Sequence, residues 1–337
     1  MKYALIGCGR IAKFHIKAAL AQDELQISAV CDILPERMDA MLAIMPEQTR
    51  TSVKKFTDYK EMLSEVSPDL VAIATESGKH AAIALDCISA GANVIIEKPI
   101  AMSVSDADEI IDRGREKGVK IAVCHQNRFN VAVSHIRRAL EQGRFGKLSH
   151  GCVHVRWNRN EDYYKQAPWR GTMAQDGGVL MNQSTHSIDI LLWMMGDVEE
   201  IHAITSNRFH PYIECEDVGV AVLRFSSGAL GTIEGTANVY PENLEETLYI
   251  FGEKGSVKAG GKSLNTIEIW QFEDEEPEDT RIRKVHEEAE NIYGNGHNPL
   301  YADMVDSIIN NRQPYIDGVE GKKAMEIVLR IYRKDEH

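Results

Sequence analysis

The chain has 337 residues, and 38 lysines and arginines against 51 aspartates and glutamates give it a formal net charge of −13. This acidity, with no basic stripe in the sequence, argues against a protein that binds the nucleic-acid backbone. With 43% hydrophobic and 26% charged residues, the composition is that of a folded globular protein large enough for two domains. No apolar run approaches the roughly 20 residues of a membrane span, and no leader is recognisable, so we expect a cytoplasmic protein without a membrane partner.

The spacing of cysteines and histidines indicates neither disulfides nor a metal centre. The six cysteines are widely separated and form no C-x-x-C pair, which predicts small buried thiols. The histidines form no H-E-x-x-H motif and no tight cluster with carboxylates along the sequence, so we expect no metal ion. The cysteines are Cys8, Cys31, Cys87, Cys124, Cys152 and Cys215.

Residues 1–124 alternate short apolar, β-branched segments with amphipathic segments of helical length, which is typical of βαβ units. The pattern predicts an α/β fold that begins with a doubly wound parallel sheet, a Rossmann domain. The expected strands are 3–6, 27–31, 70–74, 93–96 and 120–124. The expected helices are 11–21, 35–44, 79–89 and 103–116.

Residues 125–337 change to longer alternating stretches joined by glycine-containing turns, which predicts an α+β domain with an open, mostly antiparallel sheet. We expect one long helix over 177–195 and a solvated loop over the acidic stretch 273–279. The expected strands are 149–157, 218–225, 229–239, 246–251 and 266–272. Two more helices are expected over 298–311 and 321–332.

A dinucleotide fingerprint stands between the first expected strand and helix. The run Gly-Cys-Gly-Arg-Ile-Ala at 7–12 matches G-x-G-x-x-A, in which Gly7 allows a tight turn and Gly9 lets the backbone approach a pyrophosphate. Asp32 follows the second strand, where a carboxylate accepts the ribose hydroxyls of NAD and repels the 2′-phosphate of NADP. This favours NAD, although Arg37 leaves a phosphate-binding alternative and Asp32 alone also suits a simple helix cap.

Two further motifs carry groups suited to moving a proton. Lys98, in the run Glu-Lys-Pro at 97–99, follows the fourth strand, where the nicotinamide of a Rossmann enzyme lies. Asn182, His186 and Asp189 have the spacing of one helix face. A partly desolvated lysine and an imidazole both suit the interconversion of a hydroxyl and a ketone, and an asparagine can orient the substrate. The alternatives are a surface lysine and a hydrogen-bonded core histidine.

The order of G-x-G-x-x-A, E-K-P, H-Q-N-R-F and G-G-x₇-H-x-x-D resembles the glucose–fructose oxidoreductase/inositol dehydrogenase/MocA (Gfo/Idh/MocA) family over nearly the whole chain. The resemblance implies a Rossmann domain and an open sheet whose face forms dimers or tetramers, so we expect a homo-oligomer, most simply a homotetramer. It also implies that Lys98 and His186 are active-site residues. Many members have an aspartate where this chain has Asn182, which puts a second carboxylate-assisted proton relay in doubt.

The segments 163–172, 176–178 and 181–183 are similar to UDP-N-acetylglucosaminuronate 3-dehydrogenases of bacterial surface-polysaccharide pathways. The similarity implies oxidation of the C3 hydroxyl of an anionic nucleotide sugar. The cations Arg156, Arg159, Lys165 and Arg170 suit such a substrate, or they form a solvated basic loop. The expected cofactor contacts are Gly7, Gly9, Arg10, Ile11, Asp32, Thr75, His80, Glu97, Lys98, Gln126 and Arg170. The expected substrate contacts are Lys98, Asn127, Arg128, Arg156, Tyr163, Asn182 and His186.

Two other functions stay open from the sequence. One is a dehydrogenase of a free sugar, an inositol or a sugar acid, because the family accepts diverse polyols. The other is a sensor that binds the dinucleotide without chemistry, which would need neither Lys98 nor His186. Which of these two residues is the formal base, and the direction of the reaction, are not fixed by the sequence.

Overall fold

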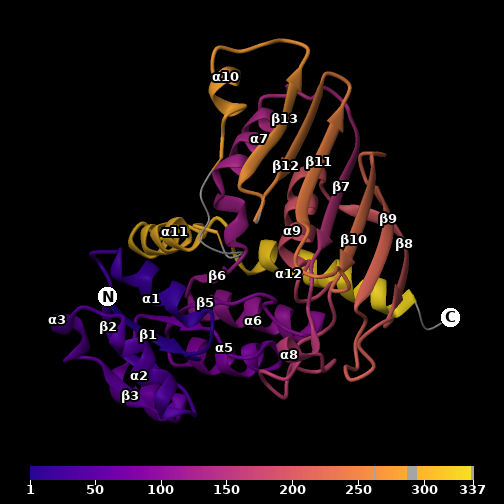
Figure 1. The fold of residues 1–337 in the computed structure, drawn as a ribbon. Helices are drawn as coiled ribbons and strands as arrows, with labels where there is room; N and C mark the ends of the chain where they lie inside the picture. The colour runs from indigo at the N-terminus through magenta and orange to yellow at the C-terminus, as the bar shows by residue number, and fades with distance from the viewer. Residues whose placement is uncertain (262, 287–293, 335–337) are drawn as a thin grey trace. The chain divides into compact units, whose positions relative to one another are not determined.

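The computed structural model describes residues 1–261, 263–286 and 294–334, which form two compact units (Figure 1). The first unit contains Met1–Cys124 and His297–Lys322. The second contains His125–Gly296 and the chain from Lys323 onward. The segment 297–322 therefore packs with the first unit, whereas the sequence analysis assigns it to the second domain.

The first unit is built on a six-stranded parallel sheet in the order β3-β2-β1-β4-β5-β6, the strand order of a Rossmann fold. Strands β4 and β5 are almost entirely buried, which explains their continuous apolar sequences. The strands are β1 (Lys2–Ile6), β2 (Gln26–Cys31), β3 (Lys54–Phe56), β4 (Leu70–Ile73), β5 (Asn93–Ile96) and β6 (Ile121–Val123). The helices are α1 (Ala12–Leu20), α2 (Pro35–Ala43), α3 (Glu47–Arg50), α4 (Tyr59–Val66), η1 (Ser77–Lys79), α5 (His80–Ser89), α6 (Val104–Lys117) and α11 (His297–Ile309), and α12 (Gly318–Lys334) begins in this unit.

The second unit contains a seven-stranded sheet in the order β13-β12-β11-β7-β10-β9-β8. Strands β7 and β10 pair in parallel and the other neighbours are antiparallel, which confirms the expected mostly antiparallel sheet. The strands are β7 (Leu148–Arg156), β8 (Val198–Ser206), β9 (Val218–Phe225), β10 (Leu230–Thr236), β11 (Glu245–Gly252), β12 (Gly255–Gly260) and β13 (Thr266–Phe272). The helices are η2 (Gln126–Phe129), α7 (Val131–Glu141), α8 (Glu161–Tyr164), α9 (Thr185–Met195) and α10 (Asp279–Ile282).

One face of this second sheet is covered and the other is open. Helices α7 and α9 pack on the covered face (Figure 1), where the inward residues of each strand are buried. In β9 burial alternates, so that Ala221 and Leu223 face inward while Val220 and Val222 face outward and are about half exposed. The outward face therefore exposes apolar residues of β9 to solvent, beside charged residues of the same face such as Arg224.

The acidic stretch 273–279 is not wholly a solvated loop, because its last residue is buried. Both carboxylate oxygens of Asp279 accept hydrogen bonds from Arg144, at 2.8 and 2.7 Å, and Oδ1 also accepts one from the indole N–H of Trp270 at 2.7 Å. These bonds hold the pKa of Asp279 below its ordinary value. Asp279 is therefore a buried residue that joins the start of α10 to Arg144 and to Trp270 of β13.

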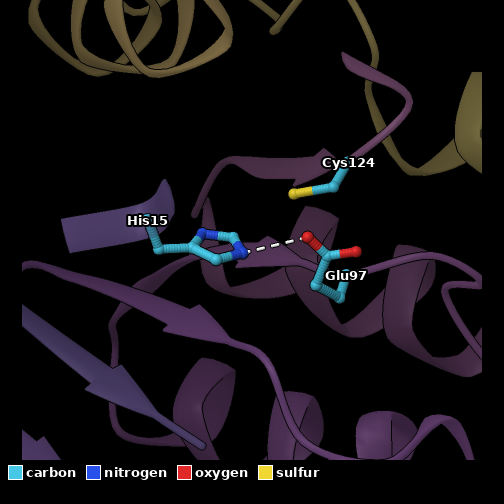
Figure 2. A group of neighbouring side chains, drawn as sticks. All are labelled: His15, Glu97 and Cys124. Carbon is cyan, nitrogen blue, oxygen red and sulfur yellow. Dashed lines mark hydrogen bonds and ion pairs between the residues drawn. The ribbon is translucent and has the colours of Figure 1, made fainter. Parts of the chain in front are cut away.

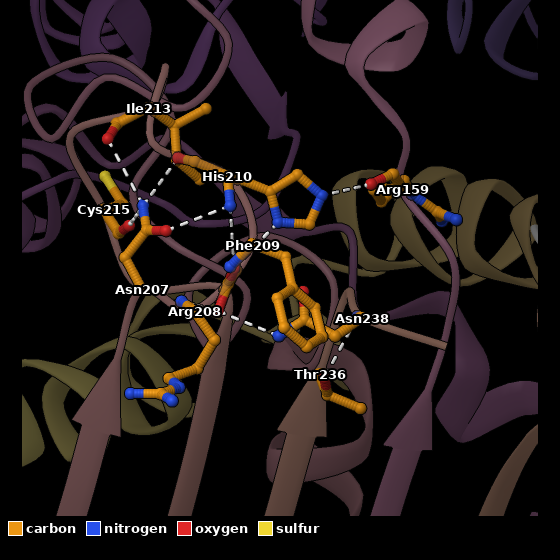
Figure 3. A network of polar contacts seen from close by, with 10 residues as sticks. Arg159, Asn207, Arg208, Phe209, His210, Ile213, Cys215, Thr236 and Asn238 are labelled. Carbon is orange, nitrogen blue, oxygen red and sulfur yellow. Dashed lines mark hydrogen bonds and ion pairs between the residues drawn. The ribbon is translucent and has the colours of Figure 1, made fainter. Parts of the chain in front are cut away.

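A network of polar contacts at the loop between β8 and β9 includes Asn207, His210 and Asn238 (Figure 3). This loop is organised around the buried carboxylate of Asp217. It accepts hydrogen bonds from the backbone N–H groups of Arg208, Phe209 and His210 and from the side chains of His210 and Asn238. Burial alone would raise the pKa of Asp217, but these bonds outweigh it and lower the pKa. The other ring nitrogen of His210 bonds the carbonyl oxygen of residue 159 at 2.6 Å, which fixes the start of the following segment.

In the described part of the chain, no helix combines the length and the apolar character that crossing a bilayer would require.

Candidate active site

The glycine-rich turn between β1 and α1 has the geometry that a dinucleotide needs. Gly7 has a φ of +92°, and a Cβ on it would lie 2.5 Å from the carbonyl oxygen of Ala74, so only glycine fits. A Cβ on Gly9 would meet nothing within 4 Å, so space is open beside the turn that leads into α1. Arg10 is exposed and Ile11 immediately precedes the helix. The turn therefore fits a pyrophosphate at a helix N-terminus.

Asp32 connects this turn to the end of β2. Its Oδ2 accepts the N–H of Cys8 at 2.8 Å and its Oδ1 accepts the N–H of Leu34 at 2.9 Å. Each oxygen has a second lone pair and can also accept a ribose hydroxyl. The guanidinium of Arg37 lies 3.9 Å from Asp32 Oδ2, so its charge faces a carboxylate. The arrangement fits NAD better than NADP.

Replacing Asp32 by asparagine is expected to raise the preference for NADPH over NADH by about 10- to 100-fold, because it removes a negative charge and keeps an oxygen that accepts hydrogen bonds. The dissociation constants of NADH and NADPH, measured by nicotinamide fluorescence, check this. Adding Arg37→Ala should then weaken NADPH binding alone. An unchanged ratio in Asp32→Asn would show that the carboxylate does not select the cofactor.

Glu97, expected to contact the cofactor, is buried in a polar network with His15, and Cys124 lies nearby (Figure 2). Its Oε1 lies 3.0 Å from His15 Nε2 and 3.6 Å from His297 Nε2. His15 Nδ1 in turn bonds the hydroxyl of Tyr301 at 2.7 Å. Burial would raise the pKa of Glu97, but His15 and His297 outweigh it and hold the pKa well below its usual value. An anion therefore lies next to Lys98 in the chain, and the N–H of Lys98 donates to Glu97 Oε2 at 3.2 Å.

Three members of this network have the donor atoms of a metal site. The ligand atoms of His15, Glu97 and Cys124 lie within 4.8 Å of one another. However, both ring nitrogens of His15 already have hydrogen-bond partners, and burial together with the charge of Glu97 raises the pKa of Cys124 far above its usual value. A neutral thiol is a poor metal ligand. The donor chemistry therefore suits a hydrogen-bond network better than a metal centre.

Thr75 and His80, both expected to bind the cofactor, lie in the segment that follows β4. His80 is buried and its Nδ1 and Nε2 face the carbonyl oxygens of Pro99 and Thr75, at 2.7 and 3.1 Å. Burial lowers the pKa of His80 below its ordinary value. His80 therefore links the segment after β4 to Pro99, the residue that follows Lys98. The sequence analysis instead expects His80 to contact the cofactor.

In the second unit, Asn182 lies before α9 and not on it. The sequence predicts a helix from 177, whereas the structure begins α9 at Thr185, because residues 177–184 form turns that start at Gly177 with a φ of +73°. Asn182 N–H bonds the carbonyl of Gly178 at 2.9 Å, and its Nδ2 donates to Oδ1 of Asp176. The expected single helix face of Asn182 and His186 is therefore wrong, although both residues belong to one short segment.

His186 occupies the first turn of α9 and is half-buried. Its Nε2 lies 3.5 Å from Nε2 of Gln126, another expected cofactor contact, and its ring meets that of His125 edge-on at 5.8 Å between centroids. One turn later, Asp189 accepts two hydrogen bonds from Arg128, at 2.8 and 2.7 Å. Helix α9 is therefore fastened to η2 on the face that carries His186.

Two arginines expected to bind the substrate are already paired with carboxylates. Arg128 is 2% exposed and is engaged by Asp189. Arg156 lies on the outward face of β7, where it pairs with Glu234 of β10 at 2.5 Å and Glu245 of β11 at 2.5 Å. Neither charge is left over for an anionic ligand. Asn127, beside Arg128, is also buried.

Tyr163, expected to contact the substrate, and Arg170, expected to contact the cofactor, are hydrogen-bonded to each other. Arg170 donates to the hydroxyl of Tyr163 at 2.6 Å, and Gln183, next to Asn182, donates to the same oxygen at 3.2 Å. The guanidinium of Arg170 also lies 4.5 Å from the ring centroid of Trp169. Asp176 and Gln183 were missed as site residues, because only the fold brings them against Asn182 and Tyr163.

Two family models match the chain. One, described as an oxidoreductase family with an NAD-binding Rossmann fold, matches residues 1–125, and the other, the GFO/IDH/MocA C-terminal domain, matches residues 133–258. The chain belongs to the Gfo/Idh/MocA oxidoreductase family. It is an NAD-dependent dehydrogenase, which confirms the fold class, the cofactor and the enzyme class expected from the sequence.

Among Gfo/Idh/MocA structures, the chain is similar to the WlbA dehydrogenase from Bordetella pertussis, in complex with NADH and UDP-GlcNAcA. They are 37% identical with a TM-score of 0.93, covering 100% of this chain and 96% of that one. The WlbA dehydrogenase from Chromobacterium violaceum, in complex with the same two molecules, is 35% identical with a TM-score of 0.89, covering 98% and 92%. Myo-inositol 2-dehydrogenase from Thermotoga maritima is 25% identical over 331 residues, covering 96% of this chain and 93% of that protein.

Within this Gfo/Idh/MocA chain, a buried carboxyl group lies directly behind the first turn of α9. Glu246 of β11 is 2% exposed, and its Oε1 accepts a hydrogen bond from the hydroxyl of Ser187 at 2.5 Å. Burial raises the pKa of Glu246 to about 7, which the bond from Ser187 offsets only in part. The neighbour of His186 is therefore linked to a group that titrates near neutrality.

Replacing Glu246 by glutamine is expected to raise the melting temperature by roughly 5 to 10 °C at about pH 8 and to change it little at about pH 5. An unfolded glutamate ionises near 4.5, so between about 4.5 and 7 the folded protein keeps a proton that the unfolded chain has lost, and stability falls as the pH rises. The shift corresponds to about 3 kcal/mol, complete above pH 7. The exposed control Glu253→Gln should change neither value. Equal melting curves for Glu246→Gln and wild type at both pH values would contradict the assignment.

Proposed function

We propose that the protein oxidises the C3 hydroxyl of UDP-N-acetylglucosaminuronate to a ketone with NAD as the hydride acceptor. The observation that carries the proposal is the 37% identity, over the whole chain, to a WlbA dehydrogenase solved with NADH and UDP-GlcNAcA. The local similarity at 163–183 supports it independently of the glycine-rich turn. Such a product suits a subsequent amino transfer in surface-polysaccharide synthesis.

In this proposal Lys98 and His186 together take up the hydroxyl proton. NAD, held by the glycine-rich turn and Asp32, supplies the hydride acceptor. The backbone N–H of Lys98 is held by Glu97 Oε2, and the contacts of η2 with α9 hold the imidazole of His186. Asn182 orients the sugar without adding charge.

We propose that Arg170 contributes positive charge for the anionic substrate. Arg156 and Arg128 are already paired with carboxylates, and Lys165 is exposed and bonded to Glu161 at 2.8 Å. Arg170 instead contacts the hydroxyl of Tyr163 and two aromatic rings, which leaves its charge uncompensated by those partners. A planar guanidinium is well suited to a carboxylate or a phosphate.

A second candidate function is the oxidation of a free polyol, favoured by the 25% identity to myo-inositol 2-dehydrogenase. Both candidates are tested by mixing purified protein and NAD with UDP-N-acetylglucosaminuronate, UDP-N-acetylglucosamine or myo-inositol while following the absorbance of reduced nicotinamide. We expect reduction with the first compound and at least about 100-fold lower kcat/KM with the others. Reduction with myo-inositol alone would favour the second candidate.

We also propose that a second copy of the chain covers the open sheet face in the cytoplasm. All six cysteines are free, as expected in a reducing compartment. Val220, Val222 and Leu230 are each about half exposed on this face, and such neighbouring apolar side chains favour a symmetric contact. Light scattering should give a dimer or tetramer for wild type and a smaller species for Val222→Asp. A monomeric wild type would contradict the proposal.

A further inference from the structure

The carboxylate of Asp176 lies directly behind Asn182 and is 1% exposed. Its Oδ1 accepts a hydrogen bond from the amide Nδ2 of Asn182, and its Oδ2 accepts one from the backbone N–H of Gly171 at 2.7 Å. Both partners are donors. The buried carboxylate therefore has a hydrogen-bond donor at each oxygen. Each bond satisfies a polar group that would otherwise be costly to bury.

The backbone around Asp176 fixes this carboxylate in place. The N–H groups of Asp176 and Gly177 both donate to the carbonyl of Thr172, at 3.1 and 3.0 Å. Gly171, with a φ of +71°, accepts the N–H of Glu214 at 2.9 Å through its carbonyl oxygen. The carboxylate is therefore held by a closed turn and by a hydrogen bond from the loop between β8 and β9 to Gly171, independently of Asn182.

A side-chain amide has a donor end and an acceptor end, and Asp176 determines which end points where. If the amide of Asn182 rotated by half a turn, its carbonyl oxygen would face the carboxylate, and two acceptors would meet without a proton between them. The bond to Asp176 excludes that orientation. The carbonyl oxygen of Asn182 is consequently turned away from Asp176.

We propose that Asp176 is a positioning residue that fixes the amide of Asn182, so that a neutral oxygen accepts a hydrogen bond from a sugar hydroxyl. This inference rests on the proposed function, in which the substrate carries a carboxylate. The charge of Asp176 lies behind the amide of Asn182, so an anionic sugar at Asn182 would meet a neutral amide and not a carboxylate.

The test uses full-length Asp176→Asn, Asn182→Asp and the double exchange Asp176→Asn/Asn182→Asp. Asparagine at 176 has one acceptor end and cannot satisfy two donors, and aspartate at 182 faces another carboxylate, so each single variant should melt at a lower temperature. In the double exchange the amide of residue 176 accepts from Gly171 and donates to the carboxylate at 182. We therefore expect its melting temperature to return most of the way to wild type.

Kinetics separate positioning from folding. We expect kcat/KM for UDP-N-acetylglucosaminuronate to fall about 10- to 100-fold in Asp176→Asn. In the double exchange it should stay at least about 10-fold low, because a carboxylate then faces the substrate. The matched control is Asp279→Asn, another buried carboxylate with several donors, which should melt earlier but keep its kcat/KM. Binding of NADH should change less than about twofold throughout.

The outcomes separate this inference from the proposed function. A wild type that fails to reduce NAD with UDP-N-acetylglucosaminuronate would overturn the proposed function, while the melting temperatures still test the contact without any substrate. A double exchange that melts no later than the single variants would overturn the contact. Recovery of both melting temperature and kcat/KM in the double exchange would overturn the role of a neutral oxygen.

Discussion

Replacing His186 by asparagine, or Lys98 by methionine, is expected to lower kcat for UDP-N-acetylglucosaminuronate by about 100- to 10,000-fold. Each change removes one of the two groups proposed to take up the hydroxyl proton. The melting temperature should stay near that of wild type, because both side chains are half-buried and neither closes the core. Steady-state rates of nicotinamide reduction, with NADH binding measured separately, check this.

Matched controls are an exposed histidine and an exposed lysine of the same two units. His202 on β8 and Lys54 on β3 are each more than half exposed, and His202→Asn and Lys54→Met should leave kcat within about twofold of wild type. If His186→Asn and Lys98→Met both retained full turnover, the proposed proton chemistry would be wrong. If only one did, the other residue alone would be the base.

The parts of the fold that the sequence predicts are those with a local signature. Continuous apolar runs identified β1, β4 and β5, and the glycine-rich run identified the turn at Gly7. The strands that were missed lack such a signature. β3 is three residues with two exposed lysines, β8 carries adjacent glutamates, and β12 begins and ends with glycine. Each is formed by pairing with a neighbouring strand, which a single segment does not encode.

In the candidate active site, too, the sequence predicts residues that have a local signature and misses those whose role depends on distant partners. Gly7 and Asp32 were predicted because a turn and a strand end determine what they do. Arg128 and Arg156 have the right charge for an anionic substrate, but whether a charge is free depends on partners that are distant in sequence. Asp176 shows the converse, since nothing in its run distinguishes it from a surface aspartate until the chain folds against Asn182.

Replacing Asp189 by asparagine is expected to destabilise the second unit by about 3 to 5 kcal/mol, because it leaves the buried guanidinium of Arg128 without its counter-ion. Both side chains are at most 2% exposed, and their two hydrogen bonds join η2 to α9. The indole of Trp193 lies 5.2 Å from the Arg128 guanidinium. Denaturant unfolding followed by tryptophan fluorescence measures the free energy of unfolding of variant and wild type. Asp197→Asn, at an exposed position beyond α9, is the control and should cost less than about 0.5 kcal/mol.

The double replacement Arg128→Met/Asp189→Leu distinguishes a stabilising pair from one that is only costly to break. Because desolvation offsets most of the attraction between buried charges, the double variant should recover much of the stability lost in Asp189→Asn. The kcat of the double variant should nevertheless be lower than that of wild type. Apolar contacts fix the distance between η2 and α9 less specifically than two directed hydrogen bonds do. A double variant with full activity would show that packing alone holds His186. A single variant within about 1 kcal/mol of wild type would mean that another group compensates the charge of Arg128.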